Sequence, residues 1–290
     1  LYSAYELALI YLYNDDYKNV ERGLMCLERC VEGDYIEGIE GLANVYFNGD
    51  LVEEDMSRAK QLLEKALELG SGNAAYRLGW MYERGFLSEE PDYVKAMEYY
   101  EKAAELDNVD GYCRAALYLA NGYSGVTDAV KSREYYEKAA GMGSCFALVE
   151  LSFLYENGNG VERSYEKAFE LCEKAAQEGY PYAMFRVGLY LEKAVLGEAK
   201  PEEAFAWYTK AAFHPSFAPA ANGVTPSRVF NFLTASTNSS YVVGNVAPAL
   251  SNIVLLQNNV IYHENIGTEY NFPSNSNADV EPSKIFDRRR

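Results

Sequence analysis

The 290-residue chain has only two histidines, His214 and His263, and both lie beyond residue 212. Residues 1–212 therefore lack the imidazole that Ser-His-Asp and Cys-His catalytic arrangements require, and they cannot form a zinc site that uses histidine. Cys26 and Cys30 are four residues apart on one predicted helix, but two ligands are too few for a closed zinc site. We therefore expect no catalytic site, cofactor or metal, and small buried apolar side chains for the cysteines.

Basic side chains are scarce: the chain has 26 Lys and Arg against 43 Asp and Glu, for a net charge of −17. The whole acidic excess lies in residues 1–212. Such a surface repels phosphate backbones, so we expect no nucleic-acid partner. It suits a basic protein partner, or it consists only of solvated outer helix faces. Apolar runs are shorter than the roughly 20 residues of a membrane helix, so we expect no membrane span.

A disulfide pattern is also missing. The five cysteines are odd in number and irregularly spaced, which favours a reducing compartment and hence a cytoplasmic location. The chain begins at Leu1, already inside a repeat, so we expect it to be a fragment whose sequence says nothing about a signal peptide.

A short block ending in Lys-Ala-Ala recurs along residues 1–212. Its best copy is Tyr99-Tyr100-Glu101-Lys102-Ala103-Ala104, and the intervals between the basic residues are 36, 37, 36, 36 and 36. Six copies at a nearly fixed interval indicate a stacked solenoid. The basic residue of each copy is Arg29, Lys65, Lys102, Lys138, Lys174 or Lys210. We place the repeats at about 1–34, 35–70, 71–107, 108–143, 144–179 and 180–212.

Each repeat is predicted to hold two helices. In helix A of the third copy, Leu78 and Tyr82 form an apolar ridge at i and i+4, and the small Gly79 lets a neighbouring helix approach closely. An Asn-Gly or Arg-Gly pair then ends the helix, where glycine suits left-handed backbone. In helix B, Ala96 and Tyr100 share one face with Ala103. Twelve helices in six antiparallel pairs follow.

These motifs resemble those of a known family. Ala74-x-x-x-Leu78-Gly79-x-x-Tyr82, followed by Lys95-Ala96-x-x-Tyr99-Tyr100-x-Lys102-Ala103-Ala104, is similar to the Sel1-like repeat, a relative of the tetratricopeptide repeat. The resemblance implies an all-α fold, a right-handed α-α superhelix of six helix-turn-helix repeats. The first copy departs most, with Arg29-Cys30-Val31 in place of Lys-Ala-Ala, and the fourth lacks the Leu-Gly pair and the Tyr.

The repeat stops after Ala212, and residues 213–290 are rich in Asn and Pro. Val242-Val243 and Val260-Ile261-Tyr262 are weak strand patterns, and residues 271–290 have a composition typical of disorder. This tail is a cap on the sixth repeat, part of a truncated domain, or a mis-joined or frame-shifted segment. The triplet Asn238-Ser239-Ser240 fits a glycosylation acceptor, although such a triplet is expected by chance here.

The function that the resemblance implies is a non-catalytic scaffold for protein–protein interaction. In tetratricopeptide-like stacks helix A lines the concave face, where a peptide or protein partner would bind. We call the residue at the position of Leu78 in each repeat the Leu78 type. We project onto the concave face the positions two before, two after and five or six after this residue, among them the acidic Glu83. The predicted partner-binding residues are Asn44, Phe47, Asn48, Tyr76, Trp80, Arg84, Leu117, Asn121, Phe153, Asn157, Phe185 and Leu189.

Three alternatives to this interpretation stay open. Packing against helix B would claim some of these side chains equally well. The solenoid would also suit a targeting or regulatory arm of an enzyme whose catalytic domain lies outside the sequence. A self-associating spacer is the third alternative.

Overall fold

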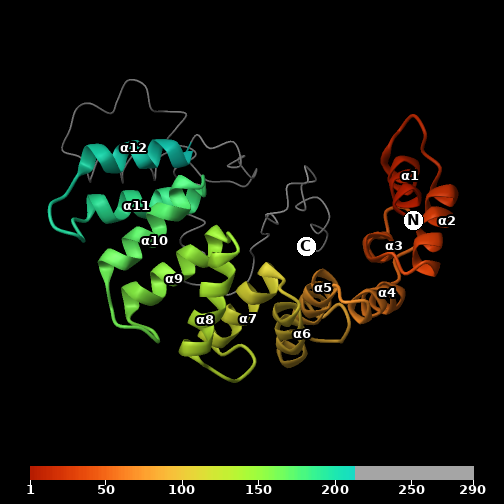
Figure 1. The fold of residues 1–290 in the computed structure, drawn as a ribbon, viewed down its shortest axis with the longest axis horizontal. Helices are drawn as coiled ribbons and strands as arrows, with labels where there is room; N and C mark the ends of the chain where they lie inside the picture. Colours follow the sequence, from red (N-terminus) through yellow and green to blue (C-terminus); the bar gives the residue numbers. More distant parts are fainter. Residues whose placement is uncertain (213–290) are drawn as a thin grey trace. The chain divides into compact units, whose positions relative to one another are not determined.

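A computed structural model describes residues 1–212, and this part of the chain consists of helices without a strand (Figure 1). The all-α prediction is confirmed. The predicted strands, both histidines and the Asn238 triplet lie outside the described residues. The helices are α1 (Tyr2–Tyr13), α2 (Val20–Glu32), α3 (Ile36–Asn48), α4 (Met56–Glu68), α5 (Gly72–Glu83), α6 (Tyr93–Glu105), α7 (Val109–Asn121), α8 (Ala129–Gly141), α9 (Cys145–Asn157), α10 (Tyr165–Gln177), α11 (Pro181–Glu192) and α12 (Pro201–Ala212).

The helices fall into two compact units, with α1–α8 in the first and α9–α12 in the second. Within each unit, consecutive helices pack as pairs: α1 with α2, α3 with α4, α5 with α6 and α7 with α8, then α9 with α10 and α11 with α12. The second helix of one pair also packs on the first helix of the next, as α4 does on α5 and α10 on α11. This is the predicted α-α solenoid.

The second helix of five repeats begins at an N-cap in the same register. In each case the side chain of the cap accepts a hydrogen bond from a backbone N–H in the first turn, which satisfies a group that the helix itself leaves unpaired. The caps are Asn19, Asp55, Asp92, Asp128 and Ser164. Each contributes about 1 kcal/mol and sets where helix B starts.

The first helix of three repeats ends at the glycine of an Asn-Gly pair. Gly49, Gly122 and Gly158 have φ values of 67°, 71° and 74°, the left-handed backbone that favours glycine. The predicted Asn-Gly helix ends are confirmed, and the asparagine is the last helical residue in each case.

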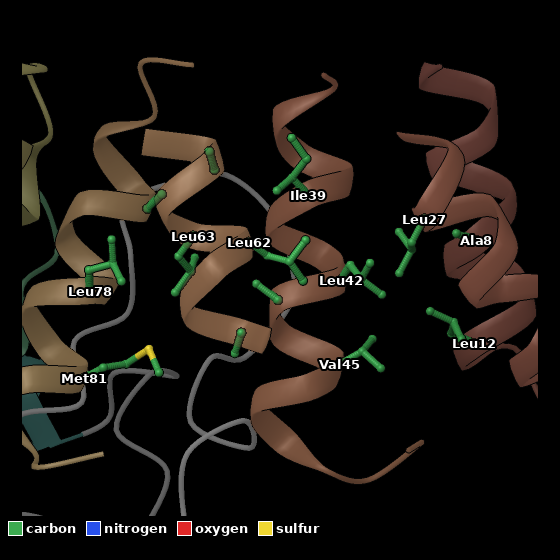
Figure 2. Packing of buried hydrophobic residues seen from close by; sticks show 14 residues of the cluster. Ala8, Leu12, Leu27, Ile39, Leu42, Val45, Leu62, Leu63, Leu78 and Met81 are labelled. Carbon is green, nitrogen blue, oxygen red and sulfur yellow. The ribbon is translucent and has the colours of Figure 1, made fainter. Parts of the chain in front are cut away.

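Buried apolar side chains are shared between neighbouring helices. Figure 2 shows Leu62 and Leu63 of α4 in the space between α3 and α5, with Leu78 of α5 beside that space and Leu42 on the opposite side of α3. All four are at most 3% exposed. A helix pair cannot bury both faces by itself, so each repeat is stabilised by its neighbours. None of the described helices is long and apolar enough to cross a membrane.

The two helices of the third repeat approach each other closely at Gly79. A Cβ atom placed there would lie 2.8 Å from the ring of Tyr100 and 3.0 Å from the backbone oxygen of Ala96. Because Tyr100 and Ala96 are fully buried, neither can move aside easily. We expect Gly79→Leu to lower the free energy of unfolding by about 1–3 kcal/mol, measured by urea denaturation.

Gly141→Leu is the matched control for this substitution. Gly141 ends α8, is exposed, and a Cβ there meets nothing within 4 Å. A urea midpoint that falls equally in both variants would contradict a close contact at Gly79.

Candidate partner-binding surface

The six side chains two positions after the residue equivalent to Leu78 in each repeat are all half-buried. None of them is sealed in the core and none stands fully in solvent, so each packs on one side and reaches the surface on the other. The first unit carries Leu9, Asn44, Trp80 and Leu117, and the second carries Phe153 and Leu189.

Two aromatic rings lie beside Trp80, and we call Phe47, Trp80 and Phe86 the Trp80 cluster. The ring centroids of Phe47 and Trp80 are 5.7 Å apart, and that of Phe86 lies 5.2 Å from each. The Arg84 guanidinium lies 6.0 Å from the Trp80 ring centroid. The cluster borders a small hollow whose walls are apolar except for one amide and one guanidinium. Its lining residues are Ala43, Asn44, Phe47, Leu63, Arg77, Trp80 and Met81.

The predicted asparagines take different positions. Asn44 is half-buried and accepts a hydrogen bond from Arg77. The Asn121 side chain is exposed and donates to the backbone oxygen of Leu117 at 2.9 Å. Asn157 is exposed, and Asn48 is half-buried at the end of α3. Asn44 is therefore the amide that borders the hollow.

Glu83 was projected onto the open face, and this projection is wrong. Glu83 is 6% exposed, and its carboxylate accepts a hydrogen bond from the Tyr100 hydroxyl. Arg114 of the next repeat is 8% exposed and places Nη1 3.5 Å from Glu83 Oε1. Burial raises the pKa of Tyr100 well above its usual value, and the Glu83 charge adds to that shift. A buried charged pair thus links the third repeat to the fourth.

Tyr76, another predicted partner residue, lies beside this pair. Its ring centroid is 5.8 Å from that of Tyr100, and the residue is half-buried. Burial raises the pKa of the Tyr76 hydroxyl, while the nearby Arg114 guanidinium lowers it. Tyr76 therefore lies between the buried Glu83–Arg114 pair and the surface.

A similar arrangement occurs in the second unit. The Arg186 guanidinium lies 3.8 Å from the Phe153 ring centroid and forms an ion pair with Glu156. Arg186 also donates to the Tyr190 hydroxyl at 2.8 Å, and that hydroxyl donates to Glu156 at 3.0 Å. Phe153 is therefore covered on one face by a cation and is half-buried. The bulk of its ring is not available as a bare apolar anchor.

Phe185 does not reach the surface. It is 3% exposed, and its ring centroid lies 5.5 Å from that of Tyr208 on α12, which covers it. Leu189, one turn further along α11, is half-buried. We therefore leave Phe185 out of the proposed surface and keep Leu189.

The sequence carried a signal for these buried ion pairs that we missed. The position just before the Leu78 type is Arg77, Arg114 or Arg186 in three repeats, beside residues that are predicted to be buried. A basic side chain at that place needs a buried partner. The acceptors are Asn44, Glu83 and Glu156, each contributed by the preceding repeat.

The cysteines are placed largely as predicted. Cys30, Cys113 and Cys172 are buried, and Cys26 and Cys145 are half-buried. Burial raises the pKa of the Cys30, Cys145 and Cys172 thiols, which disfavours the reactive thiolate. Residues 1–212 contain no group of three or more His, Cys, Asp and Glu side chains placed to hold a metal ion.

The sequence model of the Sel1 repeat matches residues 36–71, 72–108, 109–144, 146–180 and 181–212. The chain belongs to the Sel1 repeat family. The helix pair α1–α2 precedes the first matched repeat. Sel1 repeat proteins generally mediate protein–protein interactions and are generally not enzymes.

Solved Sel1 structures have a similar fold. A protective antigen from uropathogenic Escherichia coli strains superposes with a TM-score of 0.67 at 23% identity, over 92% of this chain and 57% of that one. A Sel1 repeat protein from Oxalobacter formigenes gives a TM-score of 0.63 at 24% identity, over 72% of this chain and 86% of that one. The chain thus spans little more than half the length of the first. The comparison with curated protein sequences gave no match.

Proposed function

We propose that this chain is a non-catalytic interaction module that binds a peptide or helix of a protein partner through the A helices of its first unit, at a surface centred on the Trp80 cluster. Membership of the Sel1 repeat family supports protein binding in general. The observation that carries the proposal is the half-buried Trp80 ring beside an apolar hollow.

The chemistry around the hollow suits such a guest. Tryptophan and phenylalanine supply large apolar contact areas at a small cost in side-chain entropy, and they dominate many protein interfaces. Asn44 and Arg77 bond each other at the wall, so the surface that the hollow exposes is almost wholly apolar. The tip of an apolar side chain of the guest would enter the hollow beside the Trp80 ring.

The chain offers a matched pair of substitutions to test this proposal, because Trp80 and Trp207 are its only tryptophans and both are half-buried. A partner is captured on the tagged protein from cell extract, identified and purified, and its affinity is then measured for each variant. We expect Trp80→Ala to weaken binding by about tenfold or more, the range of an interface anchor, while Trp207→Ala leaves it unchanged.

Fluorescence gives a second readout. In Trp207→Phe, Trp80 is the sole tryptophan, so a partner that covers it should shift its emission to shorter wavelength. Equal affinity of the two alanine variants, together with an unchanged Trp80 spectrum, would rule out binding at the Trp80 cluster.

A further inference from the structure

The second residue of helix B is exposed in all six repeats. Four repeats carry a polar side chain there: Glu21, Ser57, Glu166 and Glu202. The third and fourth repeats, which are neighbours, carry Val94 and Val130 instead. These valines are 57% and 51% exposed.

Valine is a poor choice at this position of a helix. An acidic side chain in the first turn interacts favourably with the helix dipole, and a β-branched residue loses side-chain freedom in a helix. Because Val94 and Val130 remain largely exposed, burial of their side chains adds little to the free energy of folding. A residue that is unfavourable for its own helix indicates a functional role, here a contact with another molecule.

Three further exposed apolar residues lie near the valines in the sequence. Tyr93, which begins α6, and Tyr123, which follows α7, are each 38% exposed, and their ring centroids are 6.4 Å apart. Val126, in the turn before α8, is 61% exposed. These five residues, which we call the valine patch, lie in the first unit where the two helices of a repeat connect. The contact between Tyr93 and Tyr123 brings the connections of the third and fourth repeats together, and exposed apolar residues that gather in this way favour an interaction site.

The charged groups beside the patch are mainly acidic. Glu98 and Glu134 follow the valines by one helical turn on the same face, and both are exposed. The basic side chains next to the valines are already paired: Lys95 with Asp92 at 3.2 Å and Lys131 with Glu101 at 2.6 Å. The net field at the patch is therefore negative, and it attracts positive charge.

We propose that the valine patch binds a short apolar segment of a protein partner that also carries Lys or Arg residues. The apolar side chains of the segment would cover the valines and tyrosines, and its basic groups would meet Glu98 and Glu134. A second copy of this chain fits less well, because it would bring another acidic surface against the first. This inference stands apart from the Trp80 cluster and does not depend on it.

The probe for this surface is a fluorescein-labelled amphipathic helical peptide of about 18 residues, with leucines on one face and lysines on the other. Binding is followed by fluorescence anisotropy. We expect Val94→Ser/Val130→Ser to weaken binding by about tenfold, because the apolar contact is lost. Serine already occupies this position as Ser57, so the melting temperature should not change.

Two further variants make the result specific. Glu21→Ser changes the same register position in the first repeat and should leave peptide binding intact. Glu98→Gln/Glu134→Gln should weaken binding at low salt and reduce its dependence on salt. Equal binding by wild type and the valine variant would overturn the proposal, as would the absence of saturable binding by wild type. A concentration-dependent dimer that the valine variant abolishes would assign the patch to a second copy and overturn it too.

Discussion

Arg114→Met is expected to lower the free energy of unfolding by about 3–5 kcal/mol, because it leaves the Glu83 carboxylate buried without its cation. Arg114 and Glu83 are at most 8% exposed, and the Tyr100 hydroxyl also donates to that carboxylate. Solvent therefore cannot replace the lost guanidinium. The measurement is urea denaturation followed by helical circular dichroism.

The test of this prediction is the combined variant Glu83→Leu/Arg114→Met/Tyr100→Phe. Replacing a buried ion pair and its tyrosine donor by apolar side chains of similar size is often neutral, so the triple variant should recover most of the loss. Arg58→Met, at an exposed position of α4, controls for the loss of one positive charge. If the triple variant were less stable than Arg114→Met, the loss would come from packing and not from an uncompensated charge.

Much of the fold could be predicted because its determinants repeat. A Lys or Arg every 36 or 37 residues indicates the solenoid, and the small Gly79 indicates a close helix contact that the structure bears out. The Asn-Gly helix ends followed from backbone rules that involve only neighbouring residues. These features can be predicted without knowing which side chains the neighbouring repeat contributes.

The candidate surface was less predictable, because position in a repeat does not by itself decide exposure. Tyr76 and Phe185 occupy the same register, yet Tyr76 is half-buried and Phe185 is covered by Tyr208 of α12. Glu83 was assigned to the open face from its register position, five residues after Leu78, but an arginine one repeat further along reaches it. Both outcomes depend on which side chain the neighbouring helix supplies. The residue pattern within one repeat does not contain that information.

Glu150→Gln is expected to change how stability depends on pH. Glu150 is half-buried on α9 with Oε1 closed to solvent. Burial raises the pKa of its carboxyl from an ordinary 4.5 to about 7, even though the Arg186 guanidinium pulls it down. The folded chain therefore holds a proton that the unfolded chain has already lost between those two values. Folding is favoured by this group at low pH, and that contribution is lost as the pH rises through about 7.

Glutamine mimics the protonated carboxyl, so Glu150→Gln should match the wild type near pH 4.5. Above pH 7 the variant should be more stable by about 3 kcal/mol, since each unit of pKa shift corresponds to about 1.4 kcal/mol. The check is urea denaturation of both proteins across this pH range, with Glu170→Gln on the exposed face of α10 as the control. Parallel stability curves for wild type and Glu150→Gln would mean that the carboxylate is already ionised in the folded chain. The Arg186 guanidinium would then outweigh burial, and Glu150 would belong to the same charged group as Glu156.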